Sequence, residues 1–252
     1  MLSQFIQWFN EKSDTPQELS LLYMRMRKFI GIIGVALPPV LIIGLIILEG
    51  QSKILDSISV YYYSDYSDYS VIGNIFDGSM FATGIFLICY QYRLLDDIIS
   101  TIAGLCAIGV ALFPTTPPPD CSRYIMKCPT PLQMTIGKWH TGFAISFFLL
   151  LALFSLFLFP KSDKKDPKDR TTEKLRRNTV YYGCGIAMLI ILGLAGLDLF
   201  VPFFHDASWL QQIHPITLFE GLAIEVFGIA WFVKGETFGI LKDKETQAPE
   251  VV

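Results

Sequence analysis

Long apolar runs, separated by short clusters of charge, constrain this sequence more than any other feature. One uncharged stretch covers residues 29–48, and about 20 apolar residues suffice to cross a bilayer as a helix. Of all residues, 52% are hydrophobic and only 17% are charged. Because a charge at the bilayer centre is costly, this pattern predicts a polytopic membrane protein and excludes an ordinary soluble domain.

The pattern predicts an all-α fold, a bundle of six transmembrane helices in one domain at residues 29–234. The predicted spans are residues 29–48, 71–92, 98–114, 137–160, 179–200 and 215–233. Before them, residues 1–28 would form an interfacial segment and a helix start, with Thr15 as the N-cap. Pro38 and Pro39 should kink the first span, because proline removes a backbone donor. Residues 235–252 would form a polar cytoplasmic tail.

Lys and Arg are shared unequally between the two sides of the predicted membrane. Six spans put both termini on one side, and most of the 20 Lys and Arg fall there; the exceptions are Lys53, Arg123, Lys127 and Lys138. Cytoplasmic loops carry an excess of positive charge. We therefore expect cytoplasmic termini and a location in the bacterial inner membrane. The basic residues 161–177 would mark this topology, and they could also contact anionic headgroups of membrane lipids.

Residues 56–77, DSISVYYYSDYSDYSVIGNIFD, are the most unusual stretch on the opposite, outer side. Serine, aspartate and tyrosine alternate there before the chain enters a span that carries Asp77. Ser70, Asn74 and Asp77 are four and three residues apart, so they would share one helix face. Such tyrosines commonly anchor a chain at the membrane interface. We interpret the stretch as a surface that leads into a polar pocket.

Several polar side chains fall within or beside the outer halves of the predicted helices. Ionisable residues inside a membrane usually face the bundle interior and mark functional sites. The candidates for an outward-facing pocket are Ser59, Asn74, Asp77, His140, Asp198, His214, Glu220 and Glu225. Structural alternatives exist for some of them: an aromatic-belt position for His140, a helix cap for His214 and an interhelical hydrogen bond for Glu225.

The outer side holds candidate residues for a zinc site and for a disulfide. Asp77, His140, His214 and Glu220 could supply the ligands of a zinc ion, which needs three or four converging side chains, although the sequence holds no HExxH or HxxxH pair. Cys121 and Cys128 flank a proline-rich loop and could form a disulfide on an oxidising side of the membrane. Two free thiols are the alternative.

A set of short motifs in the first four spans resembles known membrane families. It comprises Ser57-Ile58-Ser59, Phe113-Pro114, His140, Ala144 and Phe147-Phe148. Over about residues 31–148 the chain resembles six-helix bacterial membrane proteins of unknown function and the eukaryotic DRAM/Sfk-type proteins. That resemblance implies an architecture rather than a reaction. A fainter likeness is to membrane hydrolases of the alkaline-ceramidase and adiponectin-receptor type, and it implies a zinc-centred site that includes Ser59, Asp77 and His140.

These observations predict that the protein binds a lipid or a small amphiphile in its outer pocket. One alternative is a metal-dependent hydrolase that acts on a lipid. Another is a structural or assembly subunit that packs against a partner helix or a second copy of the chain. The sequence shows no glycine-rich phosphate loop and no nucleic-acid-binding module, and the acidic outer loops disfavour nucleic acid as a partner.

Overall fold

The computed structural model describes residues 16–49, 54–63, 71–90, 94–117, 129–162, 170–201, 213–238 and 241. Its elements are α2 (Pro16–Glu49), the 3-10 helix η1 (Ile58–Tyr63), α3 (Val71–Ile88), α4 (Leu94–Leu112), α5 (Pro131–Leu153), the π-helix η2 (Phe154–Leu158), α6 (Thr172–Phe200) and α9 (Pro215–Lys234). These ranges contain no β-strand, so the all-α prediction is confirmed for the described part of the chain.

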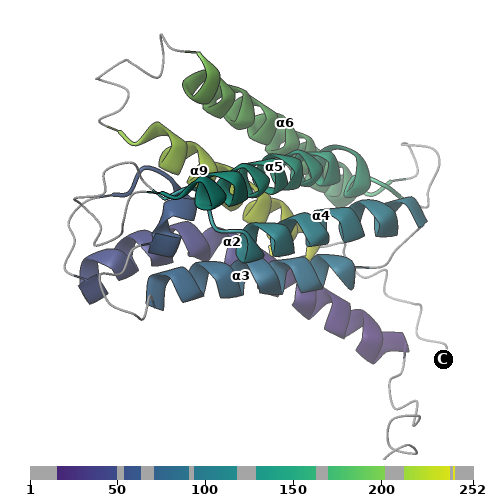
Figure 1. Ribbon diagram of the computed structural model, residues 1–252. Helices are drawn as coiled ribbons and strands as arrows, with labels where there is room; N and C mark the ends of the chain where they lie inside the picture. Colours follow the sequence, from purple (N-terminus) through teal and green to yellow (C-terminus); the bar gives the residue numbers. More distant parts are fainter. Residues whose placement is uncertain are drawn as a thin grey trace, which may run out of the picture.

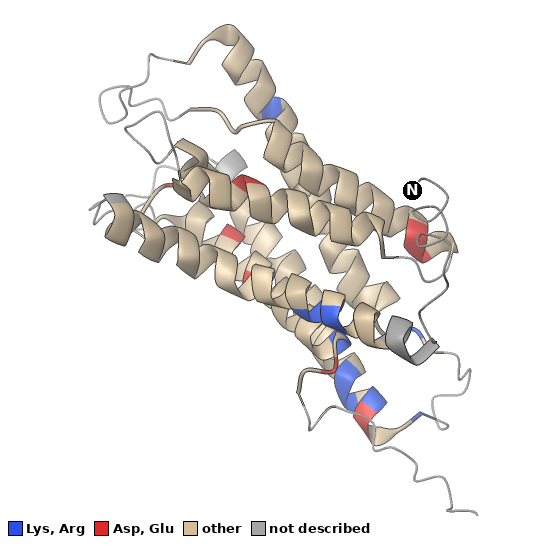
Figure 2. Ribbon diagram, turned by 90° about the horizontal axis from the view of Figure 1, so that it is seen from below, with Lys and Arg blue, Asp and Glu red and all other residues tan. Residues whose placement is uncertain are grey.

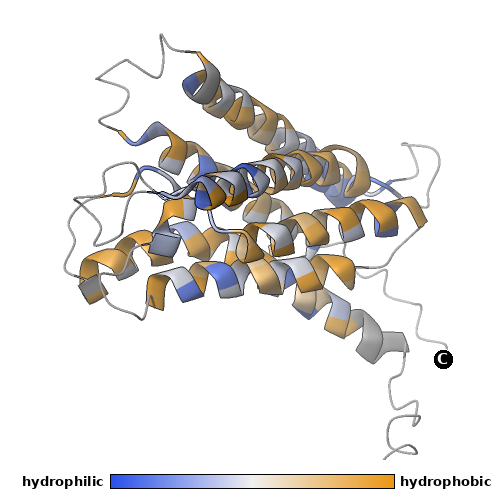
Figure 3. Cartoon of the chain, in the orientation of Figure 1, coloured by the Kyte–Doolittle hydropathy of each residue, from blue (hydrophilic) through white to orange (hydrophobic). Residues whose placement is uncertain are grey.

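Six of the described helices are long and apolar enough to cross a membrane, which fits a multi-pass integral membrane protein. Hydrophobic residues cover most of their length (Figure 3). The helices lie alongside one another, with α3 and α6 at opposite edges of the bundle in Figure 1. Most of the described Lys and Arg gather toward one end (Figure 2). We call this the basic end, and the opposite end, where η1 lies, the loop end.

Helix boundaries follow capping residues rather than the apolar runs alone. Thr130 caps α5, because its hydroxyl accepts a hydrogen bond from the Gln133 backbone nitrogen at 3.2 Å and the Gln133 side chain accepts one from the Thr130 nitrogen at 2.9 Å. This capping box starts α5 at Pro131, before the predicted residue 137. The predicted starts at Pro16 and Pro215 are confirmed. Helix α2 continues through Pro38 and Pro39, and the kink stays a prediction.

Glycines bring two pairs of helices into close backbone contact. A Cβ added at Gly104 would lie 2.5 Å from the Gly84 carbonyl oxygen, and one at Gly84 would lie 2.7 Å from the Gly104 carbonyl oxygen. Helix α2 meets α9 in the same way, since a Cβ at Gly34 would lie 2.8 Å from the Gly228 Cα. Small residues at such crossings allow the close packing that drives association of membrane helices.

An aromatic cluster fills the core near the basic end. Trp231 of α9 is fully buried, and its ring centroid lies 5.1 Å from that of Phe159 and 5.2 Å from that of Tyr90, both in edge-on geometry. Phe227 packs against the same indole at 5.9 Å. Edge-to-face pairs at these distances add to the stability gained from burial alone. This end of the bundle is therefore densely packed, and the cavities described below lie nearer the loop end.

Candidate functional site

The first turns of α9 hold the segment that connects α2 to α3. His214, at the N-cap of α9, places its Nδ1 2.9 Å from Oδ1 of Asp56. One turn later, Thr217 donates its hydroxyl proton to the carbonyl oxygen of Leu55. Residues three apart lie on the same helix face, so the two contacts fix the connecting segment along one side of α9. We call residues 54–63 the tethered segment.

Glu220 continues this face of α9 and accepts two hydrogen bonds from the tethered segment. Its Oε2 lies 2.7 Å from Oγ of Ser57 and 2.7 Å from the backbone nitrogen of Ile58, the first residue of η1. The first N–H groups of a helix have no partner within that helix, and the helix dipole favours a negative charge there. Glu220 therefore caps η1 from a distant part of the chain.

The other end of the tethered segment is held by Tyr63, whose hydroxyl donates to the carbonyl oxygen of Thr115 at 2.8 Å. Burial, and then the neighbouring Tyr62, raises the pKa of the Tyr63 phenol. The hydroxyl thus remains protonated and able to donate at neutral pH. Burial, followed by the charge of Asp77, likewise raises the pKa of Tyr62. The charge of Asp77 on α3 therefore acts on Tyr62 of the tethered segment.

His140 of α5 is only 3% exposed and uses one ring nitrogen to hold the chain that leaves α4. Its Nδ1 lies 2.6 Å from the carbonyl oxygen of Phe113. A carbonyl can only accept a hydrogen bond, so Nδ1 carries the proton, and Nε2 of the neutral ring is an acceptor. This Nε2 atom is buried and has no hydrogen-bond partner among the described residues. The ring therefore presents an unused acceptor to its surroundings.

A cavity of about 230 Å³ lies between α5, α6, α9 and the tethered segment. His140, Ser59 and Glu220 contribute to its polar part. Side chains of α6 contribute to its apolar part, together with Ile145 and Phe148 of α5. Its full lining is Ser57, Ser59, Thr115, His140, Thr141, Ala144, Ile145, Phe148, Ile191, Leu192, Ala195, Ile216, Phe219, Glu220 and Ala223. The cavity thus combines a few hydrogen-bonding groups with a largely apolar wall, as small-molecule sites usually do.

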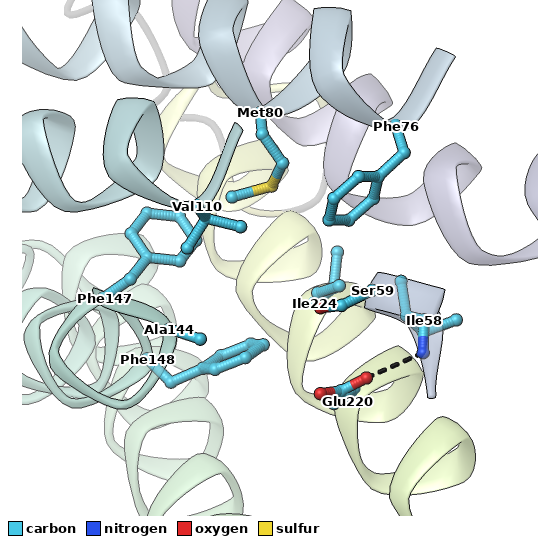
Figure 4. A pocket seen from close by; sticks show the side chains of 10 residues that line it. All are labelled: Ile58, Ser59, Phe76, Met80, Val110, Ala144, Phe147, Phe148, Glu220 and Ile224. Carbon is cyan, nitrogen blue, oxygen red and sulfur yellow. Dashed lines mark hydrogen bonds between the residues drawn. The ribbon is translucent and has the colours of Figure 1, made fainter. Parts of the chain in front are cut away.

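A smaller space of about 20 Å³ adjoins this cavity on the side of α3 and α4. Figure 4 shows the carboxyl group of Glu220 between the backbone nitrogen of Ile58 and the ring of Phe148. Beyond it, Phe76 and Met80 close the space from α3. This volume is enough for about one water molecule. Glu220 therefore stands at the boundary between the larger cavity and a nearly closed apolar core.

The structure brings three of the predicted pocket residues to one cavity, namely Ser59, His140 and Glu220. His214 and Glu225 instead line a second cavity of about 220 Å³, whose other walls come mainly from α2, α9 and the tethered segment. The eight predicted residues therefore do not form one continuous site.

The remaining three candidates lie apart from both cavities. Asn74 is exposed on α3. Asp77 is half-buried, and its Oδ1 atom has no hydrogen-bond partner in the described ranges. Asp198 is only 3% exposed near the C-terminal end of α6. The shared helix face of Asn74 and Asp77 stays a prediction, and Ser70, its third member, lies outside the described residues.

The predicted zinc ligands are not gathered into a metal site. Within the ranges that the structure describes, no three His, Cys, Asp or Glu side chains group closely enough to hold a metal ion. The zinc prediction for Asp77, His140, His214 and Glu220 thus gains no support from this geometry. The predicted disulfide between Cys121 and Cys128 lies outside the described residues.

Two features of this region were not anticipated from the sequence. Thr217 completes a polar face of α9 with His214 and Glu220, and the spacing of three residues was the signal that could have revealed it. Thr115 accepts the hydrogen bond of Tyr63 with its backbone carbonyl. Every residue has such a carbonyl, so the sequence could not indicate this contact. Outside this region, the buried position of Asp96 was not anticipated either: Asp96 is 2% exposed and paired with Lys161.

Comparisons of the chain with protein-family models, with curated proteins and with solved structures give no match. The resemblances to six-helix membrane families and to membrane hydrolases therefore remain predictions.

Proposed function

We propose that the cavity beneath the tethered segment binds a lipid or another small amphiphile through a polar end that donates hydrogen bonds. The observation that carries the proposal is His140, which lines the cavity and whose buried Nε2 has no hydrogen-bond partner among the described residues. Leaving such a group unsatisfied costs about 1–3 kcal/mol. A ligand that donates a proton to Nε2 would recover this cost.

The polar groups of the cavity favour a particular kind of head group. Nε2 of His140 accepts, and the Glu220 carboxyl group also presents acceptor oxygens. Hydroxyl and ammonium groups can donate to both residues, whereas a carboxylate has no proton to donate and would be repelled by an ionised Glu220. We therefore expect alcohols and amines to bind more tightly than fatty acids of the same chain length.

The apolar part of the cavity is suited to a hydrocarbon chain. Ile191, Leu192 and Ala195 of α6 face Phe148 and Ile145 of α5 across it. Each methylene group that moves there from water would contribute about 0.8 kcal/mol. Since α5 and α6 belong to a bundle whose outer surface is apolar, a membrane-soluble molecule is a more natural occupant than a polar metabolite.

The test compares a variant that fills the cavity with one that does not. Ala195→Phe adds a ring inside the cavity without removing any polar group, whereas Leu194→Phe adds the same ring at the neighbouring, 43% exposed position. Each purified protein is titrated with decanol, decylamine and decanoate, and binding is followed by native mass spectrometry.

We expect the wild type and Leu194→Phe to bind decanol and decylamine more tightly than decanoate, and Ala195→Phe to lose most of this binding. Equal affinity for the three probes, or equal binding by the two variants, would contradict the proposal. The proposal also predicts that His140→Phe, which keeps a planar ring but removes Nε2, weakens alcohol binding. A folded His140→Phe protein with unchanged affinity would show that Nε2 has no part in recognition.

A further inference from the structure

A second cluster of chemically active groups lies at the basic end, remote from the cavity. Positively charged side chains converge there from three helices: Arg27 of α2, Lys174 and Arg177 of α6, and Lys234 of α9. Nζ of Lys174 lies 3.3 Å from the carbonyl oxygen of Phe159, and Nζ of Lys234 lies 3.4 Å from the same oxygen. We call these four cations the basic cluster.

Part of this arrangement has a structural purpose. Phe159 ends the π-helix that extends α5, and its carbonyl lies at the negative end of a helix dipole. Cations stabilise such a terminus. Aromatic rings support the same groups: the guanidinium of Arg27 is 5.5 Å from the centroid of Tyr90, and Nζ of Lys234 is 5.5 Å from that of Phe159.

Capping one carbonyl does not require so many charges in one place. Lys234 is repelled electrostatically by Arg27, Lys174 and Arg177, and Asp96 attracts it. Asp96 is already paired with Lys161, its carboxylate being almost fully buried. The Nε atom of Arg27 is buried and has no hydrogen-bond partner among the described residues. The cluster therefore brings four positively charged side chains together, and one of them, Arg27, has a donor that is not used within the described residues.

The chemistry of the cluster matches a phosphate group. Arginine binds phosphate through paired N–H donors, and lysine adds a point charge. The cluster lies at the ends of membrane-length helices, the level at which lipid headgroups are found. Exposed apolar side chains on the same helices, including Leu22 and Leu175, could contact acyl chains. We infer that the basic cluster is a binding site for the phosphate of an anionic phospholipid.

The test uses the full chain purified in detergent and titrated with phosphatidylglycerol and phosphatidylcholine of identical acyl chains. Native mass spectrometry counts the bound lipids. The wild type should bind phosphatidylglycerol about tenfold more tightly, and Arg27→Gln should lose about fivefold of that affinity, as expected for one charge near an anionic lipid. Lys138→Gln, an exposed position at the opposite end of α5, is the matched control and should bind as the wild type does.

A second variant distinguishes loss of the binding site from loss of the folded structure. Arg27→Lys keeps the charge and should retain more binding than Arg27→Gln, whereas loss of structure would reduce both alike. Lys234→Gln should weaken phosphatidylglycerol binding in the same direction as Arg27→Gln. Equal affinity for the two lipids, or equal effects of Arg27→Gln and Lys138→Gln, would overturn the assignment. Competition by inorganic phosphate without any preference for the anionic lipid would assign the cluster to a free anion instead.

Discussion

Ser57 and Glu220 lie 163 positions apart in the sequence, yet the Ser57 hydroxyl donates a 2.7 Å hydrogen bond to Oε2 of Glu220. The same oxygen receives the backbone N–H of Ile58. One carboxylate therefore joins the start of α9 to the connection between α2 and α3. This link makes the tethered segment a wall of the cavity.

We predict that Glu220→Ala destabilises the protein by about 2–4 kcal/mol, because it leaves two donors of the tethered segment without an acceptor. Glu220→Gln keeps one carbonyl oxygen and should lose about half as much stability. Thermal unfolding of the purified proteins in detergent would measure the difference. Identical melting temperatures for wild type and Glu220→Ala would show that the tethered segment does not depend on this side chain.

The close crossing of α3 and α4 leads to a prediction with an internal control. Gly84→Ala places a methyl group about as close as 2.7 Å to the Gly104 carbonyl oxygen, and overpacking of this kind costs about 1–3 kcal/mol. Gly78→Ala on the same helix meets no atom within 4 Å and should be neutral or slightly stabilising. Chemical denaturation of both variants should separate them clearly. Equal stability of the two would mean that the crossing can adjust.

Removal of Lys161 should expose the cost of a buried charge. The Asp96 side chain is 3% exposed and pairs with Lys161, so Lys161→Met would leave a buried carboxylate without its direct ion-pair partner. We expect a loss of about 3–5 kcal/mol. The double variant Asp96→Asn, Lys161→Met should recover much of this loss, because the unpaired charge is gone. A double variant as unstable as Lys161→Met alone would contradict the explanation.

We predict that Tyr63 makes the stability of the folded protein depend on pH in the alkaline range. Its phenol has a pKa raised by burial, so the folded protein favours the protonated form and its contribution is complete below the unfolded pKa of about 10. Above that pH the unfolded chain ionises first, and the wild type loses stability relative to Tyr63→Phe. At neutral pH, Tyr63→Phe should cost about 0.5–1.5 kcal/mol for the lost hydrogen bond to Thr115.

Urea unfolding of the wild type and Tyr63→Phe between neutral pH and about pH 11 would test this dependence. Tyr182→Phe is a suitable control because it removes a tyrosine hydroxyl from a 46% exposed position on α6, away from the tethered segment. A constant difference between the wild type and Tyr63→Phe at all pH values would disprove the proposed protonation effect.

The sequence predicts the spans well because an apolar run of membrane length must satisfy its backbone hydrogen bonds within the membrane, and a helix does so. The helix boundaries differ from the predicted ones, because capping residues start helices within polar sequence. Thr130 and Thr171 begin α5 and α6 several residues before their apolar runs. Pro215 marks the start of α9 correctly because proline is favoured in the first turn of a helix.

The candidate site is harder to predict for a different reason. His140 and Glu220 stood out in the sequence because they are ionisable residues within apolar spans, and both line the cavity. Their partners are backbone groups, namely the carbonyl of Phe113 and the nitrogen of Ile58. Every residue carries such groups, so residue types alone give no sign of these contacts. The separation of Glu225 from Glu220 was predictable, because five residues place two side chains on different helix faces.

The tethered segment has a consequence for the order of assembly. Its anchors, Thr217 and Glu220, are synthesised about 160 residues after Leu55 and Ile58, whose sequence separations from them are both 162. During synthesis, α2 and α3 would be in place long before the segment between them could take its final position. The cavity wall is therefore completed only when α9 packs against α2, and a chain stopped before α9 would contain most of the bundle but no finished site.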